Sequence, residues 1–94
     1  MELRQIRYFV AAAEEEHFGR AAARVHISQP PLSQQIQSLE AELGVELFDR
    51  VGRGVRLTRA GAEFLIHART LLQQSERAAD MAQRASRGEI GRIA

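Results

Sequence analysis

Apolar residues in the first quarter of the chain recur at the spacing of one helix face. Within residues 2–15 they stand at i, i+3, i+7 and i+10, with Phe9 beside them; they are Leu3, Ile6, Val10 and Ala13. This spacing predicts a helix that packs one stripe against the rest of the domain. A second, shorter helix is predicted to begin at Gly19, a tolerated N-cap. It would bury the following apolar residues, Ala21, Ala22 and Val25.

A third helix is predicted over about residues 28–43. Ser28 is a favourable N-cap, and Gly44 is a typical C-terminal stop. Pro30 and Pro31 fall in the first turn, where backbone N–H groups have no partner within the helix. The buried face steps by four, three and four through Leu32, Ile36, Leu39 and Leu43. The opposite face is uncharged; it carries Gln29, Pro30, Ser33, Gln34 and Gln37.

The pattern changes after the third helix. Within residues 47–57, Leu47 and Phe48 are apolar, and Val55 and Leu57 alternate with Arg56. Gly52 and Gly54 enclose Arg53. Two glycines around one residue predict a short β-hairpin with Arg53 at its tip. Thr58 then caps a last helix, predicted over residues 59–87 and stopped by the glycines that follow.

The last predicted helix is long for so small a chain, roughly 43 Å at ~1.5 Å per residue. Its apolar and small residues alternate steps of four and three, as in a heptad seam: Phe64, Ala68, Leu71, Ser75, Ala78, Ala82 and Ala85. Such a seam predicts a dimerising helix. The alternative is a helix that folds back on its own domain, most readily through Phe64, Leu65 and Leu71.

Length and composition fit a single small globular domain of 94 residues. The chain has no cysteine, which excludes disulfides and thiolate metal sites. Its longest apolar run, residues 9–13, is far too short to span a membrane. The three histidines, His17, His26 and His67, are scattered, so we interpret them as structural and expect no metal or cofactor. With no nucleophile–base constellation visible, an enzyme is disfavoured.

Charge is unevenly distributed although the net charge is only +1. Residues 17–38 contain Arg20 and Arg24 and no acid, and residues 50–59 contain four arginines and again no acid. All 13 basic residues are arginine, whose planar fork suits phosphate and guanine. A GC-rich genome that favours arginine codons is an alternative cause of that bias. Two helices joined by a tight turn, with an uncharged polar face on the second, predict a helix-turn-helix that enters the DNA major groove.

At these residues the chain resembles the N-terminal region of LysR-type transcriptional regulators. The matching stretches are LRQIRYFVAAAEE, FGRAAARVHISQPPLSQQIQSLEAELGVELFDR and VRLTRAG. The resemblance implies a mostly α fold: a winged helix-turn-helix of three helices and a short β-hairpin wing in residues 1–58, then a linker and dimerisation helix in residues 59–87. The helix-turn-helix would cover residues 18–37. Residues 88–94 would begin the connection to an absent effector-binding domain.

The resemblance also implies roles for individual residues. Those expected at base edges are Gln29, Pro30, Ser33 and Gln34. Those expected near the DNA backbone are Ser28, Ser38, Arg20 and Arg50, while Arg53 would enter the minor groove as the wing residue. Two positions depart from the family pattern: position 34 is often Arg or Lys, and position 19 is often Ser or Thr. Glutamine at position 34 favours adenine where arginine favours guanine.

The predicted function is therefore sequence-specific binding of double-stranded DNA by a dimer on an interrupted inverted repeat. The family resemblance further implies a bacterial, cytoplasmic and nucleoid-associated protein, a full-length homotetramer, and a small-molecule effector bound by the absent domain. No membrane partner is expected. The alternative is a helical protein-interaction module held on a coiled-coil stalk, which would show no salt-sensitive retention on heparin or duplex DNA.

Overall fold

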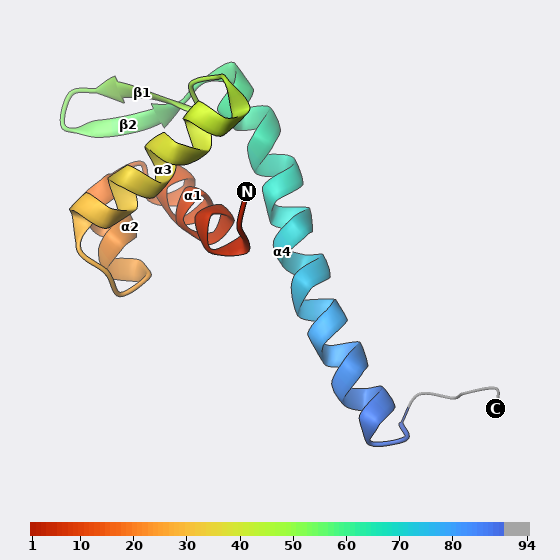
Figure 1. Ribbon diagram of the computed structural model, residues 1–94. Coiled ribbons are helices and arrows are strands. Elements are labelled where there is room, and N and C mark those ends of the chain that lie inside the picture. The colour runs from red at the N-terminus through yellow and green to blue at the C-terminus, as the bar shows by residue number, and fades with distance from the viewer. Residues whose placement is uncertain (90–94) are drawn as a thin grey trace.

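The computed structural model describes residues 1–89 and consists of a small head from which one long helix extends (Figure 1). Its elements, in chain order, are α1 Leu3–Glu15, α2 Phe18–Arg24, α3 Gln29–Leu43, β1 Phe48–Val51, β2 Gly54–Leu57 and α4 Arg59–Ser86. The predicted mostly α fold with one hairpin is confirmed. Of the predicted connection in residues 88–94, the last five residues lie outside the described part of the chain.

The helix ends agree with the sequence patterns except at α2. This helix begins at Phe18, and its N-cap is His17, whose Nδ1 accepts a hydrogen bond from the Arg20 N–H at 3.0 Å. The prediction of Gly19 as N-cap was wrong because a glycine offers no side-chain acceptor, whereas the imidazole two residues earlier does. Ser28 occupies the N-cap of α3 as predicted, but its hydroxyl makes no capping hydrogen bond.

Two adjoining groups of buried side chains form the core of the head. One joins α1, α3 and α4 and contains Ile6, Phe9, Val10, Leu39, Leu47 and Ala68. The other joins α1, α2 and α3 and contains Ala11, Ala12, Ala21, Ala22, Leu32 and Ile36. Leu3 was predicted to belong to this core but is 42% exposed. The buried stretch of α1 begins only at Gln5, so the first turn lies beyond the packed elements.

Four phenylalanines connect the elements of the head. The Phe9 ring lies 5.4 Å from that of Phe48 on β1 and 5.0 Å from that of Phe64 on α4, centroid to centroid. Phe18 at the start of α2 meets Phe48 edge-on at 5.5 Å. These distances are in the range where aromatic pairs attract. The hairpin and α4 are thus attached to α1 through one aromatic cluster.

The hairpin is antiparallel, and its register pairs Phe48 with Leu57 and Val51 with Gly54. The two-residue loop has Gly52 at φ 58°, a left-handed conformation that glycine adopts at little cost. β2 contacts the C-terminal end of α1, where the Val55 N–H donates a hydrogen bond to the Glu16 carbonyl at 3.1 Å. A Cβ on Gly54 would lie 2.6 Å from that same oxygen. The loop end of the hairpin is therefore fixed to the head.

α4 packs on the head only along its first half. Thr58, its N-cap, accepts from the Gly61 N–H at 2.9 Å and donates to the Glu46 carbonyl at 2.6 Å. Gly61 approaches the head so closely that a Cβ there would lie 2.1 Å from the Leu47 carbonyl oxygen. Beyond Leu72 the helix leaves the head, and the molecule measures 58 × 25 × 19 Å (Figure 1).

Candidate nucleic-acid interface

The outward face of α3 is open to solvent at its N-terminal half. Gln29, Pro30 and Gln34 are exposed and Ser33 is half-buried, while Leu32 and Ile36 on the other face are buried. Ser28 and Ser38 are exposed as well. The first turn of α3 contains no acidic residue. The residues predicted to face base edges thus share one accessible, uncharged surface, with the positive end of the helix dipole at its start.

Arg53 lies where the sequence predicts it, in the loop between β1 and β2, and is exposed. The hairpin extends from the head away from the free end of α4 (Figure 1). The loop that contains Arg53 therefore points away from the free end of α4.

The two arginine-rich stretches differ in their ion pairing. Within residues 1–89, none of the hairpin-region arginines forms an ion pair; these are Arg50, Arg53, Arg56 and Arg59. Arg24, by contrast, pairs with Glu14 at 2.6 Å and Glu15 at 3.3 Å. Arg20 donates to the Glu15 carbonyl at 2.8 Å. The interpretation of residues 17–38 as an acid-free patch was wrong in space, because the end of α1 brings two carboxylates to it.

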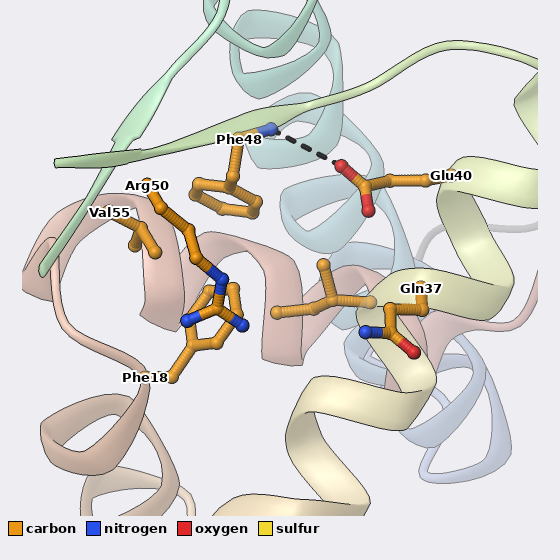
Figure 2. Close-up of a pocket in the computed structure, with 7 residues that line it drawn as sticks. Phe18, Gln37, Glu40, Phe48, Arg50 and Val55 are labelled. Carbon is orange, nitrogen blue, oxygen red and sulfur yellow. Dashed lines mark hydrogen bonds between the residues drawn. The ribbon is translucent and has the colours of Figure 1, made fainter.

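A small pocket of about 100 Å³ lies between α3 and the hairpin (Figure 2). It is lined by Phe18, Ile36, Gln37, Glu40, Phe48, Arg50 and Val55. The Arg50 guanidinium lies over the Phe18 ring, 5.8 Å from its centroid, which is within cation–π range. This stacking holds the side chain of Arg50, a residue of β1, in the pocket that Gln37 of α3 also lines.

Glu40 fixes the path from α3 to β1, a role that the sequence patterns did not reveal. Its Oε2 accepts hydrogen bonds from the Leu47 N–H at 2.7 Å and the Phe48 N–H at 3.3 Å (Figure 2 shows the second). A carboxylate that accepts backbone N–H groups makes charge-assisted hydrogen bonds. Glu40 thus connects the end of α3 to the start of the hairpin. It belongs neither to the exposed face of α3 predicted to contact DNA nor to the hairpin.

The predicted dimerisation residues fall into two groups. Ala68 is completely buried in the core of its own head, and Phe64 is half-buried against Phe9. Their packing corresponds to the fold-back alternative, so Ala68 is not available to a second chain. Farther along, Leu71 is 40% exposed, Ser75 is half-buried, and Ala78 and Ala82 are exposed.

The histidines have local contacts. His17 caps α2, and His67 lies 3.5 Å from Glu63 one turn earlier on α4. In the part of the chain that the structure describes, no group of three potential ligands could hold a metal ion. Nor does any helix among these residues combine the length and apolarity needed to cross a lipid bilayer.

Residues 3–62 match the family described as bacterial regulatory helix-turn-helix protein, LysR family. The chain belongs to the LysR family. This match covers α1 to the first turn of α4 and confirms the resemblance inferred from sequence.

Curated LysR-family relatives align over nearly the whole chain. The transcriptional regulator TfdS of Cupriavidus pinatubonensis is 58% identical over 93 residues, which are 99% of this chain and 32% of TfdS. The regulator ClcR of Pseudomonas putida is 57% identical with the same coverage. The chain therefore spans about a third of the length of these relatives.

Solved structures of LysR-family DNA-binding domains have the same fold. In a complex of the BenM DNA-binding domain with catB site 1 DNA, the protein is 44% identical, with a TM-score of 0.92 over 99% of this chain and 100% of that one. The CbnR DNA-binding domain in complex with DNA is 48% identical, with a TM-score of 0.88 over 92% and 99% of the two chains. The chain is thus a LysR-type winged helix-turn-helix DNA-binding domain.

Proposed function

We propose that this domain binds double-stranded DNA sequence-specifically as a dimer, with α3 in the major groove and the hairpin at the minor groove. The observation that carries the proposal is that one head presents two surfaces together. One is the uncharged outward face of α3, and the other is the group of hairpin-region arginines, which form no ion pair within residues 1–89. The DNA complexes of the similar CbnR and BenM domains support it.

On α3, the side chains proposed to face base edges are Gln29, Pro30, Ser33 and Gln34. Glutamine can both donate to and accept from adenine, and each good bidentate pair discriminates by roughly 1–3 kcal/mol. Because these side chains leave the helix near its N-terminal end, the partial positive charge there also favours the approach of phosphates. The Ser28 hydroxyl, which makes no capping bond, is free to donate to one.

In the hairpin, Arg53 is proposed to enter the minor groove, where narrow A·T-rich sequences concentrate negative potential. Arg50 and Ser38 are proposed to contact the DNA backbone. Arg20 is proposed for the same role, although it must reach a phosphate while bonded to Glu15 or give up that bond. We therefore expect Arg50 to contribute more than Arg20 to affinity.

The exposed half of α4 is proposed to pair two copies of the chain through Leu71, Ser75, Ala78 and Ala82. Two heads related by a two-fold axis match an interrupted inverted repeat. For the whole protein we propose a cytoplasmic, nucleoid-associated homotetramer whose small-molecule effector binds a further domain.

Base reading by α3 is tested by Gln34→Ala, with Gln74→Ala on the exposed surface of α4 as the matched control. Binding sites are selected from a random duplex library with each variant. The expected result is that Gln34→Ala relaxes the preference at one base pair per half-site, while Gln74→Ala selects the wild-type motif. An unchanged motif for Gln34→Ala would mean that Gln34 is only a solvated side chain.

The wing is tested by Arg53→Ala against Arg77→Ala, which removes the same charge from α4. Arg53→Ala should weaken binding most at sites with A·T-rich flanks and leave the major-groove preference intact. Equal losses for both variants would indicate that only total charge matters.

Dimerisation is tested by Ala78→Glu, which places a charge on the proposed seam, against Gln83→Glu, which places one on the outer face of the same helix. Sedimentation should show a weakened dimer for the first and an unchanged one for the second. A wild-type protein that is monomeric at high concentration would contradict the proposed seam.

A further inference from the structure

The carboxylate of Glu14, near the end of α1, accepts hydrogen bonds from arginines of two different helices. Its Oε2 accepts from Arg69 of α4 through Nε at 3.2 Å and Nη2 at 2.8 Å. Its Oε1 accepts from Nη2 of Arg24, the last residue of α2, at 2.6 Å. The side chain is 31% exposed. Glu14 thus joins the linker helix directly to the first helix of the helix-turn-helix.

The neighbouring Glu15 also lies close to arginines, but these belong to α2 alone. Its carboxylate lies 3.3 Å from Arg24 and 3.7 Å from Arg20, both on α2. It makes no ion pair with α4 among the described residues. Of the two adjacent glutamates, Glu14 therefore contacts α4 and Glu15 does not, among the described residues.

Across the described residues, Arg69–Glu14 is the single ion pair between α4 and the head; the other pairs of α4 lie between residues after Thr58. At its start, α4 is also held by the hydrogen bond from the Thr58 hydroxyl to the Glu46 carbonyl. Along the helix the remaining contact is apolar and includes Ala68, Phe64 and Leu72, which pack on the core that contains Ile6 and Phe9 of α1. Apolar burial is non-directional, so it constrains the angle between two helices less than a directional contact does. Charge-assisted hydrogen bonds are directional and constrain the angle.

We infer that Glu14 is a positioning residue that fixes the angle between α4 and the helix-turn-helix, and so determines which half-site spacing the dimer accepts. This inference rests on the proposed dimeric DNA binding. The pKa of Glu14 is lowered by its hydrogen bonds to Arg69 and Arg24, so the carboxylate is charged at neutral pH and the junction is formed.

The geometry makes spacing sensitive to this angle. A rotation of about 10° at the junction displaces a point ~20 Å away by ~3.5 Å, and 14 residues of helix span about that distance. Successive base pairs are ~3.4 Å apart along the duplex. A small loosening at Glu14 is therefore enough to let a head reach a half-site one base pair nearer or farther.

The first experiment measures the affinities of Glu14→Ala and wild type for duplexes whose half-sites are separated by the preferred spacing or by one base pair more or less. Glu14→Ala should reduce the discrimination between spacings about two- to fivefold, the range expected for exposed ion pairs. Base preference within each half-site should not change. Glu15→Ala is the matched control and should retain wild-type spacing discrimination.

Arg69→Ala removes the α4 partner of the same ion pair. It serves as a second variant in case Glu14→Ala fails to fold. It should broaden the spacing profile to the same extent, and the double variant should be no broader than either single one, because the two side chains share one interaction. An additive double variant, or a Glu15→Ala profile as broad as that of Glu14→Ala, would overturn the inference.

The second experiment needs no DNA. The chain has no cysteine, so spin labels can be attached through Ala41→Cys on α3 and Gln83→Cys on α4, with unlabelled protein in excess to isolate distances within one chain. Glu14→Ala should broaden the distance distribution by several ångströms, and Glu15→Ala should not. If wild type binds no duplex, the proposed function fails, and these distances still decide whether Glu14 sets the angle. An unchanged distribution, or a broadened one with an unchanged spacing profile, would overturn the inference.

Discussion

The two halves of α4 share one helical geometry and one spacing of small and apolar residues but differ in their surroundings. In the first half, Gly61 and Ala68 are buried, and Phe64, Leu65 and Leu72 pack on the core of the head. In the second half, from Gln73 to Ser86, no side chain is buried. The first half is thus part of the head, whereas the second is held by contacts within the helix itself, its backbone hydrogen bonds and the Arg84–Asp80 ion pair.

Because of this difference, we expect the first half of α4 to affect the stability of the head and the second half to affect association of two chains. An isolated stretch of fourteen helical residues is marginal in water, so the second half gains stability from the folded turns before it and from any partner that covers it. Substitutions in the first half should therefore alter unfolding of the whole head. Substitutions in the second half should alter association and leave the head intact.

The largest effect is expected from Phe9→Ala, because this fully buried ring contacts both the hairpin and α4. The cost should be about 3–5 kcal/mol of unfolding free energy, as for other buried phenylalanines. Met81→Ala in the second half of α4 should change it by less than about 0.5 kcal/mol. Urea unfolding at concentrations where the protein is monomeric measures both, and similar losses would show that the two halves are equally supported.

For Gly61→Ala, the sign of the change in unfolding free energy tests how tightly the start of α4 is packed on the head. Helix propensity alone would stabilise the protein by about 1 kcal/mol. The new Cβ, however, would lie 2.1 Å from the Leu47 carbonyl oxygen, a backbone atom that cannot move aside cheaply. The expected result is a net loss of about 1–3 kcal/mol in thermal or urea unfolding. A stabilised variant would mean that α4 can leave the head without cost.

The elements of this fold could be predicted from sequence because their signals are local. Periodicity located the four helices, and Gly52 with Gly54 located the hairpin loop. The seam in α4 could not be divided by pattern alone, because a core and a partner bury the same face of a helix. Ala68 therefore looked like a dimerisation residue although it lies in the core of its own head.

Side-chain pairing between distant positions was also beyond sequence patterns. Glu14 and Arg69 are 55 positions apart, and nothing near either residue predicts their contact. The same holds for the pairing of Arg24 with Glu14, which removes one predicted acid-free surface. On α3, by contrast, the exposed face followed directly from the buried one, and the family resemblance then named candidate base-facing residues on it.

A smaller effect separates the N-caps of α4 and α3. Thr58→Ala removes two hydrogen bonds of the Thr58 hydroxyl, to Gly61 and Glu46, and should cost about 1–2 kcal/mol. Ser28→Ala removes no capping bond, so its cost should be no more than a few tenths of a kcal/mol, as for other surface substitutions. Thermal unfolding compares the two, and equal costs would indicate that the Ser28 hydroxyl caps α3 in solution.

The smallest effect is expected from acid titration of the junction between the head and α4. The pKa of Glu14 is lowered from its ordinary value of 4.5, first by the hydrogen bond to Arg69 and then by that to Arg24. A group whose pKa is lower in the folded state stabilises that state above its unfolded pKa, and the contribution is lost as pH falls through the folded value. Thermal midpoints of wild type and Glu14→Gln should therefore differ most at neutral pH and converge as the pH falls through the lowered pKa of Glu14 in the folded state. Glu15→Gln retains the contact between Glu14 and α4, so its own pH profile should keep this part of the acid-dependent loss. A constant difference between wild type and Glu14→Gln across the acid range would show that the Glu14 charge does not stabilise the junction.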